Sequence, residues 1–468
     1  MNRLLGQEDT ICAIATPSGI GSIGIVRVSG DQAFSIVQKI FSASGSKKKT
    51  PLSDCSSHTV HHGVIRNPAT GQPVDEALLV IMKAGHSYTG EDVIEIQSHG
   101  NPHLLQTILT LLVSSGARLA EAGEFTRRAY LSGRIDLARA EAVMELIMAR
   151  SQRAQEMALK QLQGGLSALL DTLREGLIAL LSQIEASIDF SEQGIDLISP
   201  KEIETGIGRC QQEIRALVAR YEEGRQIREG STVVIFGPPN VGKSSVMNRL
   251  VGEERAIVTP IPGTTRDTLS EWISLQGHLI QIIDTAGFHE TADPIEQEGM
   301  RRGEEALKRA DLALFVLDAT QPLGSDEIAA GDRIACKKRL LILNKGDLPQ
   351  KIDIDAVRTH YPNDPIIICS AKTGEHFVEL KAQLCNLLIP QEDASEGRPL
   401  VFLLRQKIAL DRASEGLQGA LRSTQEKAPV EFIAADIRVA LDVLGEIVGD
   451  TTPDAILDQI FGQFCIGK

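Results

Sequence analysis

Hydrophobic and polar residues alternate in short runs over the first part of the chain, up to about residue 133. This pattern predicts strands, whereas one longer stretch, Pro102–Ser115, is typical of a helix. Residues 1–133 are therefore predicted to form a mixed α+β domain. Its predicted strands are Thr10–Ala15, Ile23–Val28, Val60–Ile65, Ala77–Met82 and Asp92–Gln97.

The hydrophobic period then becomes helical. Apolar residues recur at helical steps over Asp136–Phe190, in two long segments that meet near Gly164-Gly165. The capping sequence Ser199-Pro200-Lys201-Glu202 opens another helix that runs towards Arg225. None of these helices can bury its apolar stripe alone, so they need partners. Later helices are predicted at Val401–Thr424, at Ala434–Val448 and from Thr452-Pro453 to Phe461.

Between the helical parts, short apolar strands are followed by glycine-rich or polar motifs. Strand Val233–Phe236 leads into Gly237-x-x-x-x-Gly242-Lys243-Ser244, and an amphipathic segment follows. Strand, loop and helix stand in the order of a phosphate-binding loop. The glycines let successive N–H groups face one anion, Lys243 adds a positive charge, and the Ser244 hydroxyl can bind Mg²⁺.

Further motifs follow at the spacing of a guanine-nucleotide domain. Gly263-Thr264-Thr265-Arg266-Asp267 offers Thr265 to the metal. In Asp284-Thr285-Ala286-Gly287 the carboxylate can reach the Mg²⁺ shell, and the Gly287 N–H can meet the γ-phosphate. In Asn344-Lys345-Gly346-Asp347, the Asp347 carboxylate can accept the two N–H groups of guanine, a contact worth roughly 1–3 kcal/mol of discrimination. Ser370-Ala371-Lys372 completes the base pocket.

These motifs together predict a GTPase. Ser244 and Thr265 are the expected Mg²⁺ ligands. The residues expected to bind GTP are Asn240, Val241, Gly242, Lys243, Ser244, Ser245, Thr259, Pro260, Ile261, Pro262, Gly263, Thr264, Thr265, Asp284, Thr285, Ala286, Gly287, Asn344, Lys345, Asp347, Ser370, Ala371 and Lys372.

The helices on the two sides of the GTPase segment are predicted to form one bundle into which that domain is inserted. The expected fold class is thus multidomain, α/β and α, with an N-terminal α+β domain, a central helical bundle and a Ras-like P-loop GTPase domain. The boundaries are 1–133 for the first domain, 134–229 and 391–468 for the two parts of the bundle, and 230–390 for the GTPase domain. Such an insertion would couple the nucleotide state to the bundle.

Charge and cysteine content narrow the choice of partners and compartment. Forty-eight basic residues against 62 acidic ones give a net charge of −14, so any nucleic-acid contact is expected to be a local patch. The 7 cysteines are scattered without paired spacings, which suits a reducing cytosol. Met1–Asp9 is polar, and the apolar stretch Leu104–Val113 is too short to span a bilayer, so we expect a cytoplasmic protein without a membrane partner.

The chain lacks the usual means of orienting the attacking water. Ras-like enzymes carry a glutamine after Asp-x-x-Gly, and an arginine stabilises the charge of the transition state. Here that position is Phe288, which can do neither. Acidic residues just beyond it could orient water, or could form a solvated helix start: Glu290, Asp293, Glu296 and Glu298. A monovalent cation could replace the arginine, since Asn240 and the carbonyls of Thr259–Thr264 offer hard oxygen ligands.

The C-terminal sequence, Phe464-Cys465-Ile466-Gly467-Lys468, places a cysteine four residues from the end. Gly467-Lys468 does not fit a prenylation box. Two interpretations remain open from the residues alone: a mobile, exposed thiol, or a catalytic one.

Several longer motifs resemble one family across essentially the whole chain. They are Ala15-Thr16-Pro17-Ser18-Gly19, Arg27-Val28-Ser29-Gly30, Tyr88-Thr89-Gly90-Glu91-Asp92, Gly123-Glu124-Phe125-Thr126-Arg127-Arg128-Ala129, Gly263-Thr264-Thr265-Arg266-Asp267 and the terminal Phe-Cys-Ile-Gly-Lys. With them the chain resembles the MnmE (TrmE) family of bacterial tRNA modification GTPases, within the TrmE-Era-EngA-YihA-Septin-like superfamily.

The resemblance implies a homodimer formed through an N-terminal domain that binds a 5-formyl- or methylene-tetrahydrofolate one-carbon donor. It implies a potassium-activated GTPase whose two GTPase domains meet across the dimer. It also implies a heterotetramer with the FAD protein MnmG, which adds an aminomethyl or carboxymethylaminomethyl group at carbon 5 of the wobble uridine of tRNA.

Roles follow from the resemblance residue by residue. Potassium would be held by Asn240, Thr259, Ile261 and Thr264, and Glu296 would position the water. The folate would be held by Arg27, Glu95, Arg134 and Lys468, with Cys465 nearby as a catalytic candidate. This chain departs from the family pattern at Arg134, where lysine is expected, and at Pro238, where arginine is usual; the different geometry of arginine leaves the Arg134 contact less secure.

Two other functions share part of these signals. A ribosome-assembly GTPase that acts as an RNA-binding switch has the same nucleotide motifs, but no appended RNA-binding domain with a Gly-x-x-Gly loop is recognised after residue 390. A folate-binding scaffold whose GTPase domain only regulates a partner is the other alternative.

Overall fold

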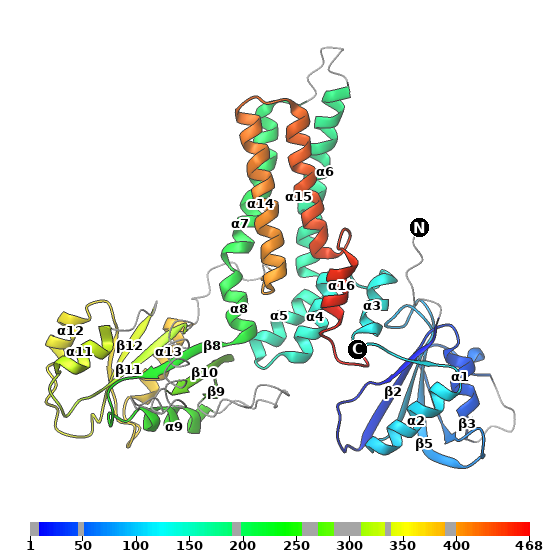
Figure 1. Cartoon of the computed structure of the whole chain (residues 1–468), viewed down its shortest axis with the longest axis horizontal. Coiled ribbons are helices and arrows are strands. Elements are labelled where there is room, and N and C mark those ends of the chain that lie inside the picture. Colours follow the sequence, from blue (N-terminus) through cyan, green and yellow to red (C-terminus); the bar gives the residue numbers. More distant parts are fainter. Residues whose placement is uncertain are drawn as a thin grey trace, which may run out of the picture. The chain divides into compact units, whose positions relative to one another are not determined.

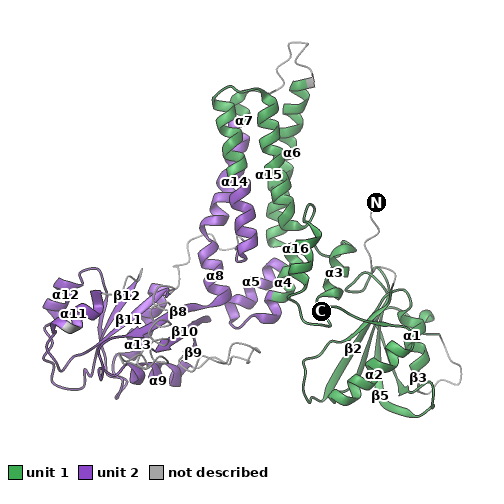
Figure 2. Cartoon of the chain, viewed as in Figure 1, with its two compact units in different colours: residues 1–144, 162–203, 415–468 green, residues 145–161, 204–414 purple. Residues whose placement is uncertain are grey.

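The computed structural model describes residues 9–44, 51–189, 198–254, 270–284, 310–332, 338–388 and 399–468. These residues belong to two compact units, coloured separately in Figure 2. One unit, called unit 1 here, comprises residues 1–144, 162–203 and 415–468. Unit 2 comprises residues 145–161 and 204–414. Each unit therefore contains segments that are far apart in the sequence.

Unit 1 begins with a seven-stranded sheet in the order β3-β4-β5-β6-β2-β1-β7. Neighbouring strands are antiparallel, except that β1 and β7 are parallel. The strands are β1 (Ile11–Ile14), β2 (Ile23–Ser29), β3 (Phe41–Ala43), β4 (Thr59–Arg66), β5 (Pro73–Met82), β6 (Val93–His99) and β7 (Arg118–Leu119).

Two helices, α1 (Ala33–Ile40) and α2 (Pro102–Ser114), cover one face of this sheet (Figure 1). Their apolar faces share a core with inward-facing strand residues, among them Val26, Leu79 and Ile94, all fully buried. Asn101 caps α2 by accepting hydrogen bonds from the backbone of His103 and Leu104, and Pro102 occupies the first helical position. Local capping and the period-two pattern thus explain why this segment forms an α+β layer.

The rest of unit 1 is helical. Helix α6 (Gly165–Asp189) packs along α15 (Val430–Val448), and the ion pairs Arg174–Asp450 and Arg438–Glu185 tie their two ends. Helix α16 (Asp454–Phe461) packs on α3 (Glu124–Leu131). Leu457, Phe461 and Phe464 share a small core with α4 (Leu137–Met148).

Unit 2 holds a six-stranded sheet in the order β13-β12-β11-β8-β10-β9. All neighbours are parallel except the hairpin β9–β10. The central strands are buried on both faces, as expected of a parallel sheet with helices on each side. The strands are β8 (Ser231–Phe236), β9 (Ser270–Leu275), β10 (His278–Asp284), β11 (Leu312–Asp318), β12 (Arg339–Asn344) and β13 (Ile366–Ile368).

The helices of unit 2 are of two kinds. Those within the sheet domain are α9 (Lys243–Glu254), α11 (Ser325–Asp332), α12 (Ile354–His360) and α13 (Phe377–Leu388). The others are α5 (Gln152–Leu162), α7 (Pro200–Ala219), α8 (Tyr221–Glu229) and the first half of α14 (Leu404–Gln425), whose residues from 415 onward belong to unit 1. Gln211 on α7 donates a hydrogen bond to the backbone of Ser414 on α14, and Phe402 packs with Ile227 of α8. Segments from both sides of the sheet domain therefore pack together.

The predicted fold class is confirmed: an α+β N-terminal part, a helical bundle and an inserted P-loop GTPase sheet. The capping sequence also behaves as predicted, since Ser199 and Glu202 exchange hydrogen bonds. Two helical predictions were too simple. The segment 136–190 contains α4, α5 and α6, and the helix towards Arg225 divides at Arg220 into α7 and α8. No helix of the described segments is both long and apolar enough to cross a membrane.

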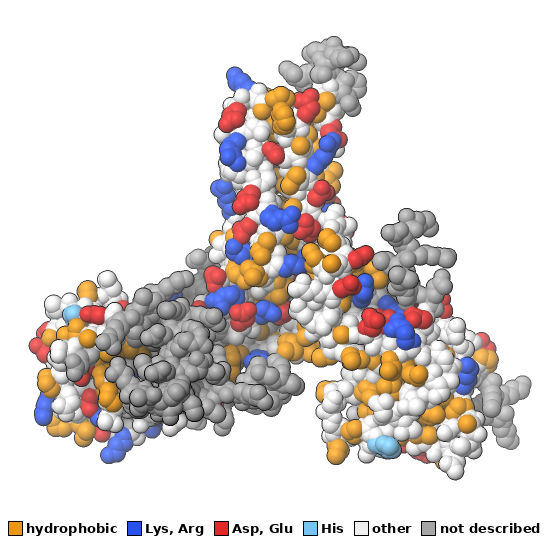
Figure 3. All heavy atoms as spheres, in the orientation of Figure 1, with side chains coloured by type: hydrophobic (Ala, Val, Ile, Leu, Met, Phe, Trp, Pro, Cys, Tyr) orange, Lys and Arg blue, Asp and Glu red, His pale blue; other side chains and the backbone are white. Residues whose placement is uncertain are grey.

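Basic and acidic side chains are interspersed along the helices on the face shown in Figure 3. Many of them form ion pairs within one helix, such as Arg220–Glu223, Arg225–Glu222 and Lys407–Asp411. The chain as a whole carries a net charge of −14, and a local nucleic-acid contact stays a prediction.

Candidate functional site

The phosphate-binding loop connects β8 to α9. Gly242 has φ 97°, in the left-handed region, and a Cβ at this position would collide with Nδ2 of Asn344. Asn240 also lies in the left-handed region, with φ 61°, a conformation that asparagine tolerates better than most residues. The loop is therefore tightly curled and enters α9 directly at Lys243.

Lys243 is folded back over this loop. Its Nζ donates to the carbonyl oxygens of Gly237 and Pro238, at 2.9 and 2.8 Å. Burial lowers the pKa of the Lys243 ammonium, and the Asp284 carboxylate opposes part of the shift. A cation held in a buried position at a helix N-terminus is well placed to neutralise a phosphate.

The magnesium candidates meet at the end of β10. The Ser244 hydroxyl donates to Oδ2 of Asp284 at 2.7 Å, although the two residues come from different elements. Asp284 is 4% exposed. A hydroxyl and a carboxylate that converge beside a phosphate-binding loop fit a Mg²⁺ ion, which prefers oxygen ligands.

The guanine-reading motif follows β12, and its asparagine is a structural link. Asn344 is 3% exposed; its Nδ2 donates to the carbonyl of Val241 at 2.9 Å, and its Oδ1 accepts from the backbone of Ala371 at 3.0 Å. Asp347 is exposed, and its Oδ1 accepts a hydrogen bond of 2.7 Å from the buried Ser370 hydroxyl. Three loops of the predicted pocket thus meet at the carboxyl ends of parallel strands.

Two successive carbonyls of the phosphate loop are held by two successive residues of the guanine motif. Asn344 binds the carbonyl of Val241, and Lys345 Nζ donates to the carbonyl of Asn240 at 3.1 Å. Because C=O and N–H point in opposite directions across a trans peptide, fixing these carbonyls also fixes the direction of the next two N–H groups. The two loops therefore form one rigid edge.

The remaining predicted nucleotide residues within the described ranges lie nearby in the chain. Ser245 is exposed in the first turn of α9, and Lys372 is exposed next to Ala371. The others lie outside the described residues, so their roles stay predictions: Thr259, Pro260, Ile261, Pro262, Gly263, Thr264, Thr265, Thr285, Ala286, Gly287 and Glu296. Of the expected potassium ligands only Asn240 lies within the described residues, where it is exposed, so the potassium site stays a prediction.

A second group of predicted residues meets in unit 1. Arg27 on β2 and Glu95 on β6 are direct cross-strand partners, and their side chains form an ion pair at 2.8 Å. Arg27 also lies 5.5 Å from the Phe125 ring centre and donates to the carbonyl of Gly467 at 3.4 Å. The C-terminal tail is thus held against the sheet by a residue 440 positions earlier in the chain.

The tail is seated by its backbone. Ile466 forms an antiparallel bridge with Ala122, and Gly467 has φ 98°. A Cβ on Gly467 would collide with the carbonyl of Ile14, so only glycine fits there. Burial, and then the positive charge of Arg27, lower the pKa of Lys468, whereas Glu95 opposes the shift.

Two of the predicted folate-site residues are less closely joined. Arg134 Nη1 donates to the carbonyl of Gly85 at 3.2 Å, in the loop that also carries Tyr88, whose ring centre lies 5.9 Å from the Arg27 guanidinium. Cys465 is a free, exposed cysteine on the tail. The structure thus brings Arg27, Glu95 and the tail together, a group called the Arg27 site here, and places Arg134, which follows α3, against the loop of Gly85 and Tyr88.

Glu91, Glu124 and Arg128 belong to the motifs that carry the family resemblance, and no role was predicted for them. Arg128 is 5% exposed and forms ion pairs with Glu91, Glu124 and Asp9 at 2.9–3.0 Å. The Ser29 hydroxyl donates to Glu91 in turn. This network joins the start of β1, the loop before β6 and helix α3 beneath the Arg27 site. Charged residues within motifs were the available signal. The i,i+4 spacing allows the pair Glu124–Arg128, but the pairs of Arg128 with Glu91 and Asp9 could not be read from spacing.

Family profiles match most of the chain. The profile described as "GTP-binding protein TrmE N-terminus" matches residues 10–134, and that of the "MnmE helical domain" matches residues 137–465. The chain is 43% identical to the "tRNA modification GTPase MnmE" of Syntrophus aciditrophicus (strain SB), over 98% of this chain and 100% of that protein. It is also 43% identical to the protein of the same name from Carboxydothermus hydrogenoformans, over 99% and 100%.

A solved structure of Aquifex aeolicus Era bound to GDP.AlF4⁻ is 26% identical and covers 40% of this chain and 66% of that one; its TM-score of 0.29 adds nothing to the assignment. The relatives that match over their full length are sufficient to assign the family. That family implies GTP and Mg²⁺ as ligands of the site in unit 2. The chain belongs to the MnmE family of tRNA modification GTPases.

Proposed function

We propose that the chain couples GTP hydrolysis to the modification of the wobble uridine of tRNA, at carbon 5 of the base. The observation that carries the proposal is the convergence of the phosphate loop, Asp284 and the guanine motif at one edge of the sheet in a chain whose relatives are named tRNA modification GTPases. The modification would add an aminomethyl or carboxymethylaminomethyl group, with the FAD protein MnmG as partner.

In the nucleotide site the described residues would bind and orient. Lys243 would exchange its two loop carbonyls for phosphate oxygens, and Ser244 with Asp284 would hold Mg²⁺ at the metal side of the loop. Asp347, presented by Ser370, would accept the N–H groups of guanine. Mg²⁺ supplies charge neutralisation on the phosphates.

Hydrolysis itself would proceed without the glutamine and the arginine that Ras-like enzymes use. We assign Glu296 to orient the attacking water, because Phe288 cannot. Asn240, with Thr259, Ile261 and Thr264, would hold a potassium ion, which supplies positive charge beside the phosphates. Thr265 would join Ser244 at Mg²⁺. For Glu296→Ala we expect GTP affinity to remain while turnover is lost; normal hydrolysis in potassium would contradict the assignment.

The Arg27 site would bind a tetrahydrofolate one-carbon donor. Arg27, Arg134 and Lys468 offer positive charge for carboxylates, and Glu95 can accept from N–H groups of a pterin ring. Cys465, an exposed cysteine on the same tail as Lys468, would act near the donor. We further propose a homodimer through this domain, and a heterotetramer with MnmG.

Potassium dependence gives the sharpest test of the nucleotide mechanism. GTP turnover of the full chain is measured in potassium and in sodium, for the wild type and for Asn240→Gly, which removes the amide oxygen while glycine accepts the φ of 61° without strain. We expect potassium to stimulate only the wild type, and both proteins to bind a fluorescent GDP analogue. Equal rates in both salts for the wild type would remove the potassium assignment.

The tRNA and folate assignments are tested separately. Mass spectrometry of wobble uridine in cells that lack the gene, with and without the restored chain, should show loss and recovery of the modification; unchanged tRNA would remove the proposal. Calorimetric titration of the full chain with 5-formyl-tetrahydrofolate should give binding that Arg27→Met weakens. Exposed Arg66, which donates to the carbonyl of Gly71, supplies the control Arg66→Met.

A further inference from the structure

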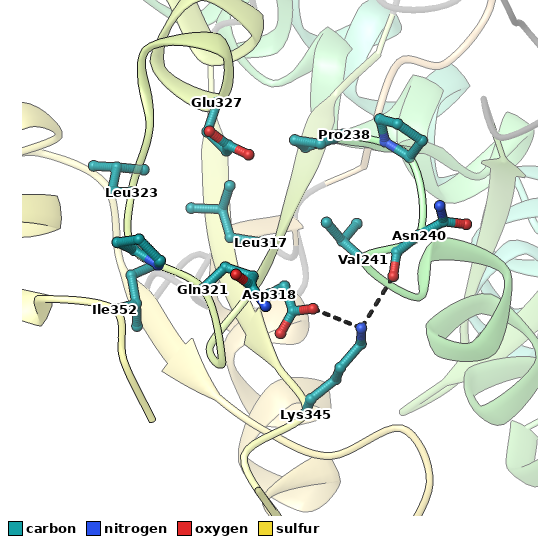
Figure 4. A pocket seen from close by; sticks show the side chains of 12 residues that line it. Pro238, Asn240, Val241, Leu317, Asp318, Gln321, Leu323, Glu327, Lys345 and Ile352 are labelled. Carbon is teal, nitrogen blue, oxygen red and sulfur yellow. Dashed lines mark hydrogen bonds and ion pairs between the residues drawn. The ribbon is translucent and has the colours of Figure 1, made fainter. Parts of the chain in front are cut away.

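The Lys345 ammonium lies between the guanine motif and the phosphate loop. Besides the carbonyl of Asn240, it contacts Oδ2 of Asp318 at 2.6 Å, and Figure 4 shows both interactions. Asp318 is the last residue of β11 and belongs to none of the nucleotide motifs. The lysine is thus fixed by one group on each side.

Asp318 is itself held in place. Its Oδ1 accepts from the backbone N–H of Thr320 at 2.9 Å and from the Thr320 hydroxyl at 2.7 Å. Its side chain is 14% exposed, against 34% for that of Lys345. Both carboxylate oxygens are therefore in use, and the orientation of Asp318 is set by a turn rather than by the lysine.

A cavity of about 270 Å³ lies beside this pair, so the Lys345 side chain has room to adopt other positions. It is lined by apolar side chains, including Leu317, Leu323 and Ile352, and by a second carboxylate, Glu327 (Figure 4). Glu327 accepts from the backbone of Gly324 at 3.1 Å. A flexible lysine on the wall of such a cavity can turn towards Glu327 or towards solvent, and Asp318 is the group that opposes this.

We propose that Asp318 is a positioning residue for guanine-nucleotide binding, which holds Lys345 on the carbonyl of Asn240 and thereby slows the release of the nucleotide. With Lys345 in place, the peptide between Asn240 and Val241 keeps its N–H direction, and the stem of Lys345 keeps its place beside Asp347 in the base-reading motif. Without Asp318, the phosphate loop and the guanine motif lose one of their two connections, and the nucleotide leaves more easily. The inference rests on the nucleotide site proposed above.

Release of a fluorescent GDP analogue from the full chain, followed by stopped flow, tests it. Asp318→Asn keeps the size and removes the charge, so we expect release to be about tenfold faster, as the loss of a hydrogen bond to a charged group implies, with association unchanged. The matched control is Glu327→Gln, which removes a carboxylate from the same cavity without touching the pair; its release rate should equal that of the wild type. Thr320→Val should have a smaller effect in the same direction, and it tests the inference if Asp318→Asn does not fold.

A double-mutant cycle separates positioning from general support of β11. In a Lys345→Met background, Asp318→Asn should cause no further acceleration, because the group that it positions is gone. An unchanged release rate in Asp318→Asn, or the same acceleration in both backgrounds, would overturn the inference. Failure of the wild type to bind the analogue would instead contradict the proposed nucleotide site.

Discussion

The nucleotide site of unit 2 and the Arg27 site of unit 1 are built in opposite ways. In the nucleotide site, each functional residue follows a strand within its own short motif, and parallel strands bring those motifs to one edge. In the Arg27 site, two side chains on neighbouring strands meet a tail whose carbonyl comes from position 467. The residues of the nucleotide site are positioned by the loops that carry them, whereas the Arg27 site forms only when segments far apart in the sequence pack together.

This difference predicts different sensitivity to substitution. The nucleotide site rests on loops whose conformation is set by glycines and by several hydrogen bonds per loop, so a single side chain can be removed while the frame remains. Beyond the buried Phe464, the described residues hold the tail by few contacts: the bridge between Ala122 and Ile466, the bond from the Gly123 N–H to the Cys465 carbonyl, the bond from Arg27 and the fit of Gly467. One change in its backbone should therefore release all of it.

The largest effect is expected at Lys243. Lys243→Ala removes the buried cation that neutralises the phosphates, and the loss of one such electrostatic group typically costs about 10²–10³ in turnover. GTP hydrolysis and nucleotide affinity are measured together, with exposed Lys338→Ala of the same sheet domain as control. A hydrolysis rate within a few fold of the wild-type rate would mean that the loop backbone, and not the Lys243 charge, is responsible for the activity of the site.

Next comes the tail. Gly467→Ala should unseat it, because the new Cβ collides with the carbonyl of Ile14 at an unfavourable φ; strain of this kind costs on the order of 1–3 kcal/mol. Hydrogen exchange of the C-terminal peptide should speed up about ten- to a hundredfold. Gly208→Ala, in α7 with open space around it, is the matched control and should leave this exchange unchanged. Equal protection in both variants would show that the tail is not seated as described.

Asp347→Asn changes a single side chain of the nucleotide site and tests its role in recognising guanine. The amide reverses half of the hydrogen-bonding pattern, so guanine should bind more weakly, by about 1–3 kcal/mol, and xanthine nucleotides should bind instead. Competition between GDP and XDP analogues measures the change. Because Ser370 can still donate to the side chain at position 347, the fold should persist, and an unchanged base preference would argue against the assigned role.

The smallest effect is expected for the contact between Arg153 and His278, two residues of unit 2 that are far apart in the sequence. Arg153 of α5 donates to Nε2 of His278 on β10, so the folded state requires an unprotonated Nε2. Burial, and then Arg153, lower the pKa of His278 to about 4, while Glu223 opposes the shift. The unfolded chain takes up this proton near pH 6.5 and the folded chain does not, so stability should fall from about pH 6.5 towards pH 4, by about 1–3 kcal/mol, and then level off.

The single tryptophan, Trp272, lies on the neighbouring strand β9 and reports on this contact by fluorescence. The urea midpoint at pH 7.5 and pH 4.5 is compared between the wild type and His278→Gln, which keeps an acceptor but cannot titrate. The wild type should lose more stability at pH 4.5 than the variant. A parallel loss in both would assign the pH effect to other groups.

Much of the fold could be predicted because local rules agree with the tertiary structure. The period-two strands, the capping sequence at Ser199 and the strand before each nucleotide motif were visible in the sequence and recur in the structure. Helix α1 and strand β11 were not predicted, although both pack in a core. Their apolar residues form short patterns that become meaningful only when the partners that cover them are known.

The sequence by itself determined the nucleotide motifs and the family, because phosphate and guanine recognition need particular residues at fixed spacings along one segment. It could not determine that Asp318 pairs with Lys345, that Arg128 gathers three carboxylates, or that Gly467 fits against Ile14. Except for Glu124, which stands one helical turn before Arg128, those contacts join residues whose separation along the chain carries no information about their distance in space. Only the packing of sheets, helices and tail brings them within hydrogen-bonding reach, which is why the tertiary structure alone decided them.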